Sequence, residues 1–281
     1  MSAAYVLINP KAGKGCTEAE LEALEVLLPL PVKKTDITAI ENWKTFLSAL
    51  DPEDWLIVAG GDGTLHHFVN DTCGLPLPEE VWYWPIGTGN DFAREFGREA
   101  GDTPVRIRQH LDRLPMVEVN GKKRRFLNGV GFGIDGYCTA EGDRLRSRGE
   151  KKINYTAIAI RGLLGGYQPT AATVSVDGKS YHYESVWLAP TMLGKYYGGG
   201  MIPTPGQDRQ KNTLSVLVFH DSGKLRTLTI FPGIFKGKHI RHIKHVQVLR
   251  GRDIKVEFRE PRPLQMDGET IPEVRSYRAW R

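Results

Sequence analysis

The stretch Trp55-Leu56-Ile57-Val58-Ala59-Gly60-Gly61-Asp62-Gly63-Thr64 decides the fold of the first part of this chain. It opens with an apolar, partly β-branched run, which is typical of a buried strand. The glycines that follow predict a tight turn, and residues 64–70 predict a helix with Thr64 as its N-cap. A strand, a glycine-rich turn and a helix N-terminus present main-chain N–H groups to an anion. We therefore predict a phosphate-binding loop at Gly60, Gly61, Asp62, Gly63 and Thr64.

Asp62 makes this interpretation more specific. A carboxylate beside a phosphate is repulsive unless it holds a metal ion, a bridging water or a hydrogen-bond donor. Asp62 therefore indicates Mg²⁺ and phosphoryl transfer rather than simple anion binding. A tight surface turn is the alternative, and the strand before it and the helix after it argue against that alternative.

Bulk composition limits the protein class. A chain of 281 residues is long enough for two domains with separate cores. The net charge of +5 fits an anionic ligand, an anionic membrane face or RNA without selecting among them. The widely spaced Cys16, Cys73 and Cys138 form no disulfide framework or metal-binding pair, which favours a cytoplasmic location. We expect no signal peptide and no membrane span, so a lipid substrate would be met at the membrane surface.

Residues 1–118 alternate apolar strands with amphipathic helices, which predicts an α/β domain on a doubly wound parallel sheet. The expected strands are 4–8, 32–34, 55–59 and 81–86, and the expected helices are 17–28, 38–50, 64–70 and a short one ending at Phe96. Ligands on such sheets bind beyond the carboxyl ends of the strands. Three glycine-bearing loops, 9–15, 60–64 and 87–90, follow strands at that edge.

Residues 119–271 predict a mainly antiparallel β-sandwich domain. The strands expected after about Pro115 are 116–119, 124–129, 172–176, 180–189, 214–220, 244–249 and 254–260, with one helix at 153–164. Asn120-Gly121 and Asp177-Gly178 favour hairpin turns. The tail 272–281 is a candidate to complete the first domain. The cleft between the two domains is the expected active site.

Two further loops favour phosphate binding. Asn9-Pro10-Lys11-Ala12-Gly13-Lys14-Gly15 combines glycines with lysines, but no Gly-Lys-Ser/Thr opens the next helix, so it is not a Walker loop. In Gly87-Thr88-Gly89-Asn90 the Thr88 hydroxyl suits a phosphate or ribose oxygen, and Asn90 or Asp91 suits a helix cap. A solvated turn and a well-capped helix are the respective alternatives.

Two acidic motifs lie further along the chain. Gly131–Gly136 matches the dinucleotide pattern GxGxxG without a surrounding βαβ unit, so we interpret it as a close-packed turn at the domain junction with Asp135 facing the cleft. In Gln265-Met266-Asp267-Gly268-Glu269 the acids suit a general base and its electrostatic partner. A hairpin turn with solvated acids is the alternative for this second motif.

Taken in order, these motifs resemble the bacterial diacylglycerol kinase and lipid kinase family, which has an NAD kinase-like fold. The matching segments span nearly the whole chain: Asn9-Pro10 with Gly13, 60–64, 87–94, 131–135 and 267–269. The resemblance implies an ATP-dependent lipid kinase that uses Mg²⁺, with diacylglycerol converted to phosphatidic acid as the first expectation. An NAD kinase-like enzyme for a soluble substrate and a catalytically inactive nucleotide sensor are the alternatives.

The resemblance also implies roles and partners. Glu269 would accept the proton of the lipid hydroxyl with Asp267 beside it, and Asp62 and Asp135 would join a water-bridged network around Mg²⁺. We expect peripheral contact with the inner membrane face and no nucleic acid, and we leave a homodimer open. The implied nucleotide-binding residues are Asn9, Pro10, Lys11, Ala12, Gly13, Thr35, Gly60, Gly61, Asp62, Gly63, Thr64, Leu65, His66, Gly87, Thr88 and Asn90.

One segment departs from the family pattern. The family follows its glycine and proline loop with Asp-Gly, and that aspartate binds a structural metal. Asn212-Thr213 stands at this place in the chain. Because a neutral amide is a weaker ligand for a hard divalent cation than a carboxylate, the sequence argues against a structural metal site at Asn212, unless Asp208 substitutes.

Overall fold

The computed structural model describes residues 2–10, 15–150 and 153–281, and the chain divides into two compact units. The first unit ends at Leu114 and the second begins at Pro115. The sequence suggested this division after residue 118. Each unit has its own sheet and its own core.

The first unit is built on a five-stranded sheet with the order β2-β1-β3-β4-β5. The pairs β2–β1, β1–β3 and β3–β4 are parallel, and only the short β5 is antiparallel to its neighbour. This arrangement confirms the predicted parallel sheet, with an antiparallel edge strand that the sequence did not indicate. The strands are β1 (Ala4–Ile8), β2 (Val32–Asp36), β3 (Trp55–Gly60), β4 (Val81–Pro85) and β5 (Val105–Arg106).

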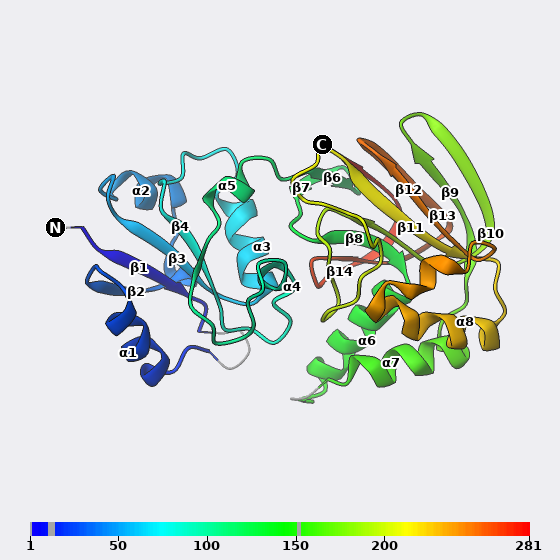
Figure 1. Cartoon of the computed structure of the whole chain (residues 1–281), viewed down its shortest axis with the longest axis horizontal. Helices are drawn as coiled ribbons and strands as arrows, with labels where there is room; N and C mark the ends of the chain where they lie inside the picture. Colours follow the sequence, from blue (N-terminus) through cyan, green and yellow to red (C-terminus); the bar gives the residue numbers. More distant parts are fainter. Residues whose placement is uncertain (1, 11–14, 151–152) are drawn as a thin grey trace. The chain divides into compact units, whose positions relative to one another are not determined.

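Helices cover both faces of this sheet (Figure 1). On one face, Leu21 and Leu24 of α1 (Glu18–Leu27) pack against Val6 and Ile57. On the other face, Trp43 of α2 (Trp43–Ser48) contacts the ring of Phe68 in α3 (Asp62–Asp71). Strand residues alternate between the two faces, so both helical layers bury apolar side chains against one sheet. Two short helices complete the unit, α4 (Asp91–Arg94) and α5 (Arg108–Leu111).

Three predicted helix boundaries in this unit were wrong. Gly61 is the N-cap of α3, so Thr64 lies inside the first turn rather than before it. The helix expected at 38–50 is interrupted: a 3₁₀ turn, η1 (Ile37–Ala39), precedes α2, whose N-cap is Asn42. The Asn42 side chain accepts a hydrogen bond from the Thr45 amide at 3.0 Å. This N-cap makes the helix begin at Trp43 rather than at residue 38. The helix expected to reach Phe96 ends at Arg94.

The second unit is a nine-stranded sheet in which every pairing is antiparallel. Its long strands β10 and β13 are joined by β8 at one end and by β9 at the other. This confirms the predicted antiparallel second domain. The strands are β6 (Met116–Val119), β7 (Lys122–Arg125), β8 (Gly129–Gly133), β9 (Thr170–Val176), β10 (Lys179–Met192), β11 (Leu214–His220), β12 (Val246–Gly251), β13 (Asp253–Met266) and β14 (Glu269–Trp280).

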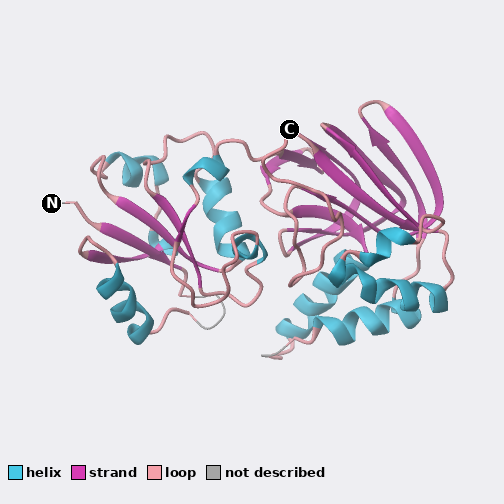
Figure 2. Ribbon diagram, viewed as in Figure 1, coloured by secondary structure: helices cyan, strands magenta, loops and turns pink. Residues whose placement is uncertain are grey.

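Helices gather on one side of this second sheet (Figure 2). Ile134, Leu163 and Ile230 of the helical layer share a core with Trp187 and Phe219 of the strands. The layer contains α6 (Ile134–Ser147), α7 (Tyr155–Arg161), the π-turn η2 (Gly162–Gly166), α8 (Lys224–Ile230) and the 3₁₀ turns η3 (Phe231–Lys236) and η4 (Lys238–Arg241).

The second unit differs from the sequence expectation at three places. The strand expected at 124–129 is split into β7 and β8. The segment 131–136 is no turn, because β8 runs directly into α6 after Gly133. Its glycines do serve close packing, since a Cβ at Gly131 would lie 2.4 Å from the Pro190 Cα. The tail 272–281 lies in β14, which pairs with β13 and β6, so it belongs to the second unit.

Candidate active site

The two glycine loops of the first unit touch through their main chains. The amides of Ile86 and Gly87 both donate to the Gly60 carbonyl at 3.1 Å. A Cβ at Gly87 would lie 2.3 Å from the Gly61 Cα, so only glycine fits there. The loops after β3 and β4 therefore form one continuous surface at the carboxyl edge of the sheet.

The Asp62 carboxylate joins these loops a second time. Its Oδ2 accepts the Asp91 amide at 2.8 Å and its Oδ1 accepts the Phe92 amide at 3.0 Å. These amides open α4, so the charge also complements a helix N-terminus. Asp62 is thus a bridge within the first unit. Each oxygen of a carboxylate can accept two hydrogen bonds or bind a cation in addition to one hydrogen bond. The role of Asp62 near Mg²⁺ stays a prediction.

Asn90 and Thr88 occupy different environments in the second glycine loop. Asn90 is buried in a left-handed conformation, with φ of 49°. Its Nδ2 donates to the Gly87 carbonyl at 2.7 Å, and its Oδ1 accepts the Tyr83 hydroxyl at 3.2 Å. Asn90 therefore shapes the loop from within. Thr88 is exposed, so its hydroxyl is accessible to a ligand.

The side chains after Gly63 are packed inside the first unit. Thr64 lies against Gly60, where a Cβ would come within 2.6 Å of the Thr64 Cβ. Leu65 is in the core, and the His66 ring is buried 3.3 Å from the Asn70 amide nitrogen. Side-chain contacts from Leu65 and His66 to a nucleotide would need this packing to open. The groups of this loop that are suited to an anion are therefore its main-chain amides, since the first N–H groups of an α-helix have no intrahelical acceptor.

The other predicted nucleotide residues lie on the β1 side of the sheet. Asn9 and Pro10 directly follow β1, at the same carboxyl edge as the glycine loops. Thr35 lies in the edge strand β2, paired with Leu7. The predicted contacts of Lys11, Ala12 and Gly13 fall outside the described residues.

In the second unit, Asp135 is a buried carboxylate at the start of α6. It is 7% exposed, and its Oδ1 accepts the Gly136 amide at 2.8 Å. Within the described part of the chain, its Oδ2 has no hydrogen-bond partner. Burial raises the pKa of Asp135 from 3.8 to about 7. An orphaned carboxylate oxygen of this kind fits a cation or a hydrogen-bond donor.

Asp267 and Glu269 flank the turn between β13 and β14. Asp267 and Gly268 have φ of 48° and 92°, as in the tight turns that favour Asp-Gly. Asp267 is buried, and its carboxylate accepts the amides of Leu127, Asn128 and Gly129 at 2.7–3.1 Å. The alternative of solvated acids is therefore wrong for Asp267, which ties the turn to the start of β8.

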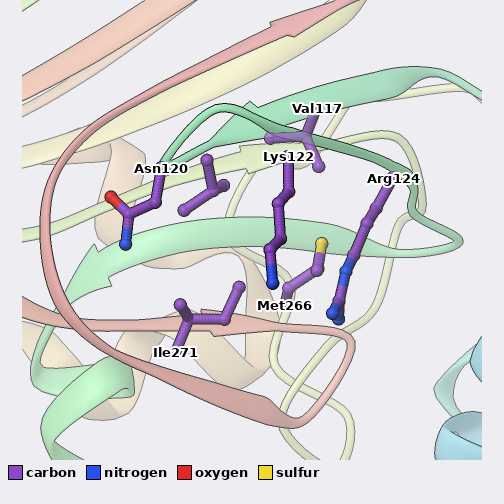
Figure 3. A pocket seen from close by; sticks show the side chains of 7 residues that line it. Val117, Asn120, Lys122, Arg124, Met266 and Ile271 are labelled. Atoms are coloured by element: carbon purple, nitrogen blue, oxygen red, sulfur yellow. The ribbon is translucent and has the colours of Figure 1, made fainter.

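Glu269 has the accessibility that a proton acceptor requires. Its side chain is 24% exposed, and its Oε2 lies 3.5 Å from Nη1 of Arg124. Arg124 also lines a pocket of about 160 Å³. Figure 3 shows the Lys122 and Arg124 side chains extending from β7 over Met266 and Ile271. The pocket is lined by Val117, Val119, Asn120, Lys122, Arg124, Met266 and Ile271.

Lys122 and Arg124 were not predicted as site residues. The sequence did indicate that these two side chains lie together, because residues 122 and 124 follow the Asn120-Gly121 hairpin turn and alternate residues of a strand share one face. Their proximity to Glu269 depends on strand pairing across more than a hundred residues, which no local pattern contains. Among the described residues, no cluster of three or more His, Cys, Asp or Glu side chains could hold a metal ion.

Comparison with known proteins identifies the family. Residues 3–118 match the diacylglycerol kinase catalytic domain, and residues 128–278 match the YegS C-terminal NAD kinase beta sandwich-like domain. The chain belongs to the diacylglycerol kinase and lipid kinase family. It is therefore a kinase, a phosphotransferase, as the motif order predicted.

Individual relatives are distant in sequence. A diacylglycerol kinase of Mycobacterium tuberculosis H37Rv is 28% identical over 211 residues, covering 73% of this chain and 67% of the relative. A diacylglycerol kinase of Bacillus subtilis 168 is 26% identical over 231 residues, covering 79% and 73%. The crystal structure of a diacylglycerol kinase from Bacillus anthracis Sterne matches with a TM-score of 0.64 and 21% identity over 100% of this chain and 94% of the other. This structural match shows a shared fold.

The contact between the loops predicts a difference between two glycines. Gly87→Ala should lower the free energy of unfolding of the first unit by roughly 1–3 kcal/mol, because its Cβ would collide with a main chain that must move. Gly63→Ala is the control, since a Cβ there meets nothing within 4 Å. Urea denaturation compares the two variants. Equal stability of both would contradict the close approach of the loops.

The buried carboxylate predicts a pH dependence. The folded protein retains the Asp135 proton up to about pH 7, whereas an aspartate in the unfolded chain releases it near 3.8. The free energy of unfolding therefore falls as pH rises through this window. Asp135→Asn should match the wild type near pH 4 and exceed it by about 2–4 kcal/mol at pH 8. Urea denaturation in EDTA at both pH values measures this; a difference that does not grow with pH would refute it.

Proposed function

We propose that this kinase transfers the γ-phosphoryl group of ATP to the hydroxyl of a lipid, with diacylglycerol as the acceptor and phosphatidic acid as the product. The observation that carries the proposal is the accessible Glu269 carboxylate, which is joined through Arg124 to a largely apolar pocket. A base beside an apolar pocket suits an acceptor with a hydroxyl and hydrocarbon chains better than a polar dinucleotide.

The first unit would bind the nucleotide. The main chain of residues 60–64 and 87–88 would hold the phosphates at the N-terminus of α3, with the Thr88 hydroxyl as an added donor. Asp62 and the orphaned Asp135 oxygen are the residues that would serve Mg²⁺. Bound Mg²⁺ supplies positive charge that screens the triphosphate.

The second unit would bind the acceptor and hold the base. The lipid oxygen forms a bond to the γ-phosphorus, its proton passes to Glu269, and the bond from the γ-phosphorus to the bridging oxygen breaks to release ADP. Lys122 and Arg124, which line the pocket, would supply positive charge for the new phosphate. Positioning and charge stabilisation would supply most of the rate enhancement.

Surface composition supports a substrate held in a membrane. Leu225 and Ile243 are 81% and 82% exposed, and Leu164 and Phe235 are also exposed. Exposed lysines and arginines separate Leu225, Phe235 and Ile243 between residues 224 and 244. Such mixtures contact anionic membrane surfaces. In the portion of the chain that is described, no helix combines the length and the apolar character needed to span a bilayer.

The test is transfer of labelled phosphate from ATP in the presence of Mg²⁺. Acceptors are diacylglycerol, ceramide and monoacylglycerol in mixed micelles, and NAD in solution. We expect diacylglycerol to be phosphorylated, and Glu269→Gln to lower kcat by about 10²–10⁴-fold with nucleotide affinity unchanged, because only the proton acceptor is removed.

Glu273→Gln is the matched control, since Glu273 is an exposed acid on the same strand. It should retain wild-type turnover. Phosphorylation of NAD alone would refute the lipid acceptor, and normal turnover by Glu269→Gln would remove Glu269 from the mechanism.

A further inference from the structure

The loop at residues 207–213 does not fit the structural metal that the family pattern implies. Asn212 offers only a neutral amide oxygen there. Asp208, the substitute that the sequence suggested, is exposed and accepts the Gln210 amide at 2.9 Å within its own turn. A hard divalent cation requires several oxygens, including carboxylates, and the described residues hold no such cluster here.

A guanidinium group is bound at this loop instead. Nη1 of Arg281 donates to the carbonyl oxygens of Arg209 at 2.9 Å and Lys211 at 2.7 Å. These carbonyls lie three residues and one residue before Asn212, and both accept from one positive group. The Arg281 amide donates to the Arg252 carbonyl at 3.0 Å, so the backbone that carries this side chain is anchored independently.

Other side-chain donors satisfy one further carbonyl of this loop and two carbonyls outside it. Gln207 is buried, and its Nε2 donates to the carbonyls of Leu193 at 3.2 Å and Thr213 at 3.0 Å. Nη2 of Arg250 donates to the Gly206 carbonyl at 2.8 Å. Within the loop, the carbonyls of Arg209, Lys211 and Thr213 therefore each accept a protein N–H group.

The loop is also tied to the segment before β8. Arg209 is buried, and its Nη1 donates to the Leu127 carbonyl at 2.6 Å. Its Nη2 lies 3.1 Å from Oδ1 of Asn128. The amides of Leu127 and Asn128 are the ones that Asp267 accepts. One connected set of charge-assisted hydrogen bonds thus joins residues 207–213 to the β13–β14 turn.

We propose that the guanidinium of Arg281 takes the place of a structural divalent cation in this kinase. The loop at residues 207–213 folds around side-chain donors of its own chain and needs no metal. This inference concerns folding and holds for any acceptor, so its test does not use turnover.

The test is thermal unfolding of the nucleotide-free full chain after dialysis against EDTA, and again with added Mg²⁺ or Ca²⁺. We expect the wild-type Tm to be the same in EDTA and in either cation. Arg281→Ala should lower Tm by about 5 °C, because it leaves the carbonyls of Arg209 and Lys211 without their donor.

Arg278→Ala is the matched control, since Arg278 lies three residues before Arg281, near the end of β14, and forms an exposed ion pair with Asp253. We expect it to change Tm by less than about 1 °C. Arg281→Lys keeps the charge but not the planar donor group, and it should fall between the wild type and Arg281→Ala.

Two results would overturn the inference. One is an unchanged Tm for Arg281→Ala. The other is a wild-type Tm that falls in EDTA and loses this dependence in Asn212→Ala, which would show a metal at the loop. If Arg281→Ala fails to fold, the comparison of the wild type with Asn212→Ala, each in EDTA and in cation, still decides whether a metal binds at the loop.

Discussion

The contact between the main chains of Gly61 and Gly87, closed by the Asp62 carboxylate, is the constraint on which the proposed nucleotide site depends. Two parallel strands end side by side, and their loops meet because neither has a Cβ at the point of contact. Asp62 then bonds the amides that open α4. The two loops thus form one main-chain surface held together by hydrogen bonds, which suits preorganised phosphate binding.

The second unit uses an aspartate in the same way. The buried Asp267 carboxylate accepts hydrogen bonds from three amides at the start of β8. These bonds hold the turn that carries Glu269 in place. In both units an aspartate of a sequence motif accepts hydrogen bonds from backbone amides, while a neighbouring group remains accessible to ligands. In our proposal, Thr88 and the loop amides serve ligands in the first unit, and Glu269 and the orphaned oxygen of Asp135 do so in the second. A carboxylate in a kinase motif is therefore not by itself a metal ligand or a base.

The sequence predicts those features that local patterns contain. Alternation and apolar runs gave β1 and β11 with their correct bounds, and Asn-Gly and Asp-Gly pairs placed the hairpins after Val119 and Val176. Features that depend on tertiary contact were missed. Helix α6 was not predicted because the glycines near its start suggested a turn. Gly136 is instead required by packing, because a Cβ there would lie 2.0 Å from the Pro263 carbonyl oxygen. The pocket beside Glu269 depends on β14 pairing with both β6 and β13.

A crystal structure of the protein with Mg²⁺ and ADP tests the central claim most directly. The phosphate oxygens should lie within hydrogen-bonding distance of main-chain amides in residues 61–64 and near the Thr88 hydroxyl, with the bonds from Asp62 to the Asp91 and Phe92 amides retained. A nucleotide bound away from both glycine loops, or loops that separate when it binds, would contradict a preformed main-chain phosphate site.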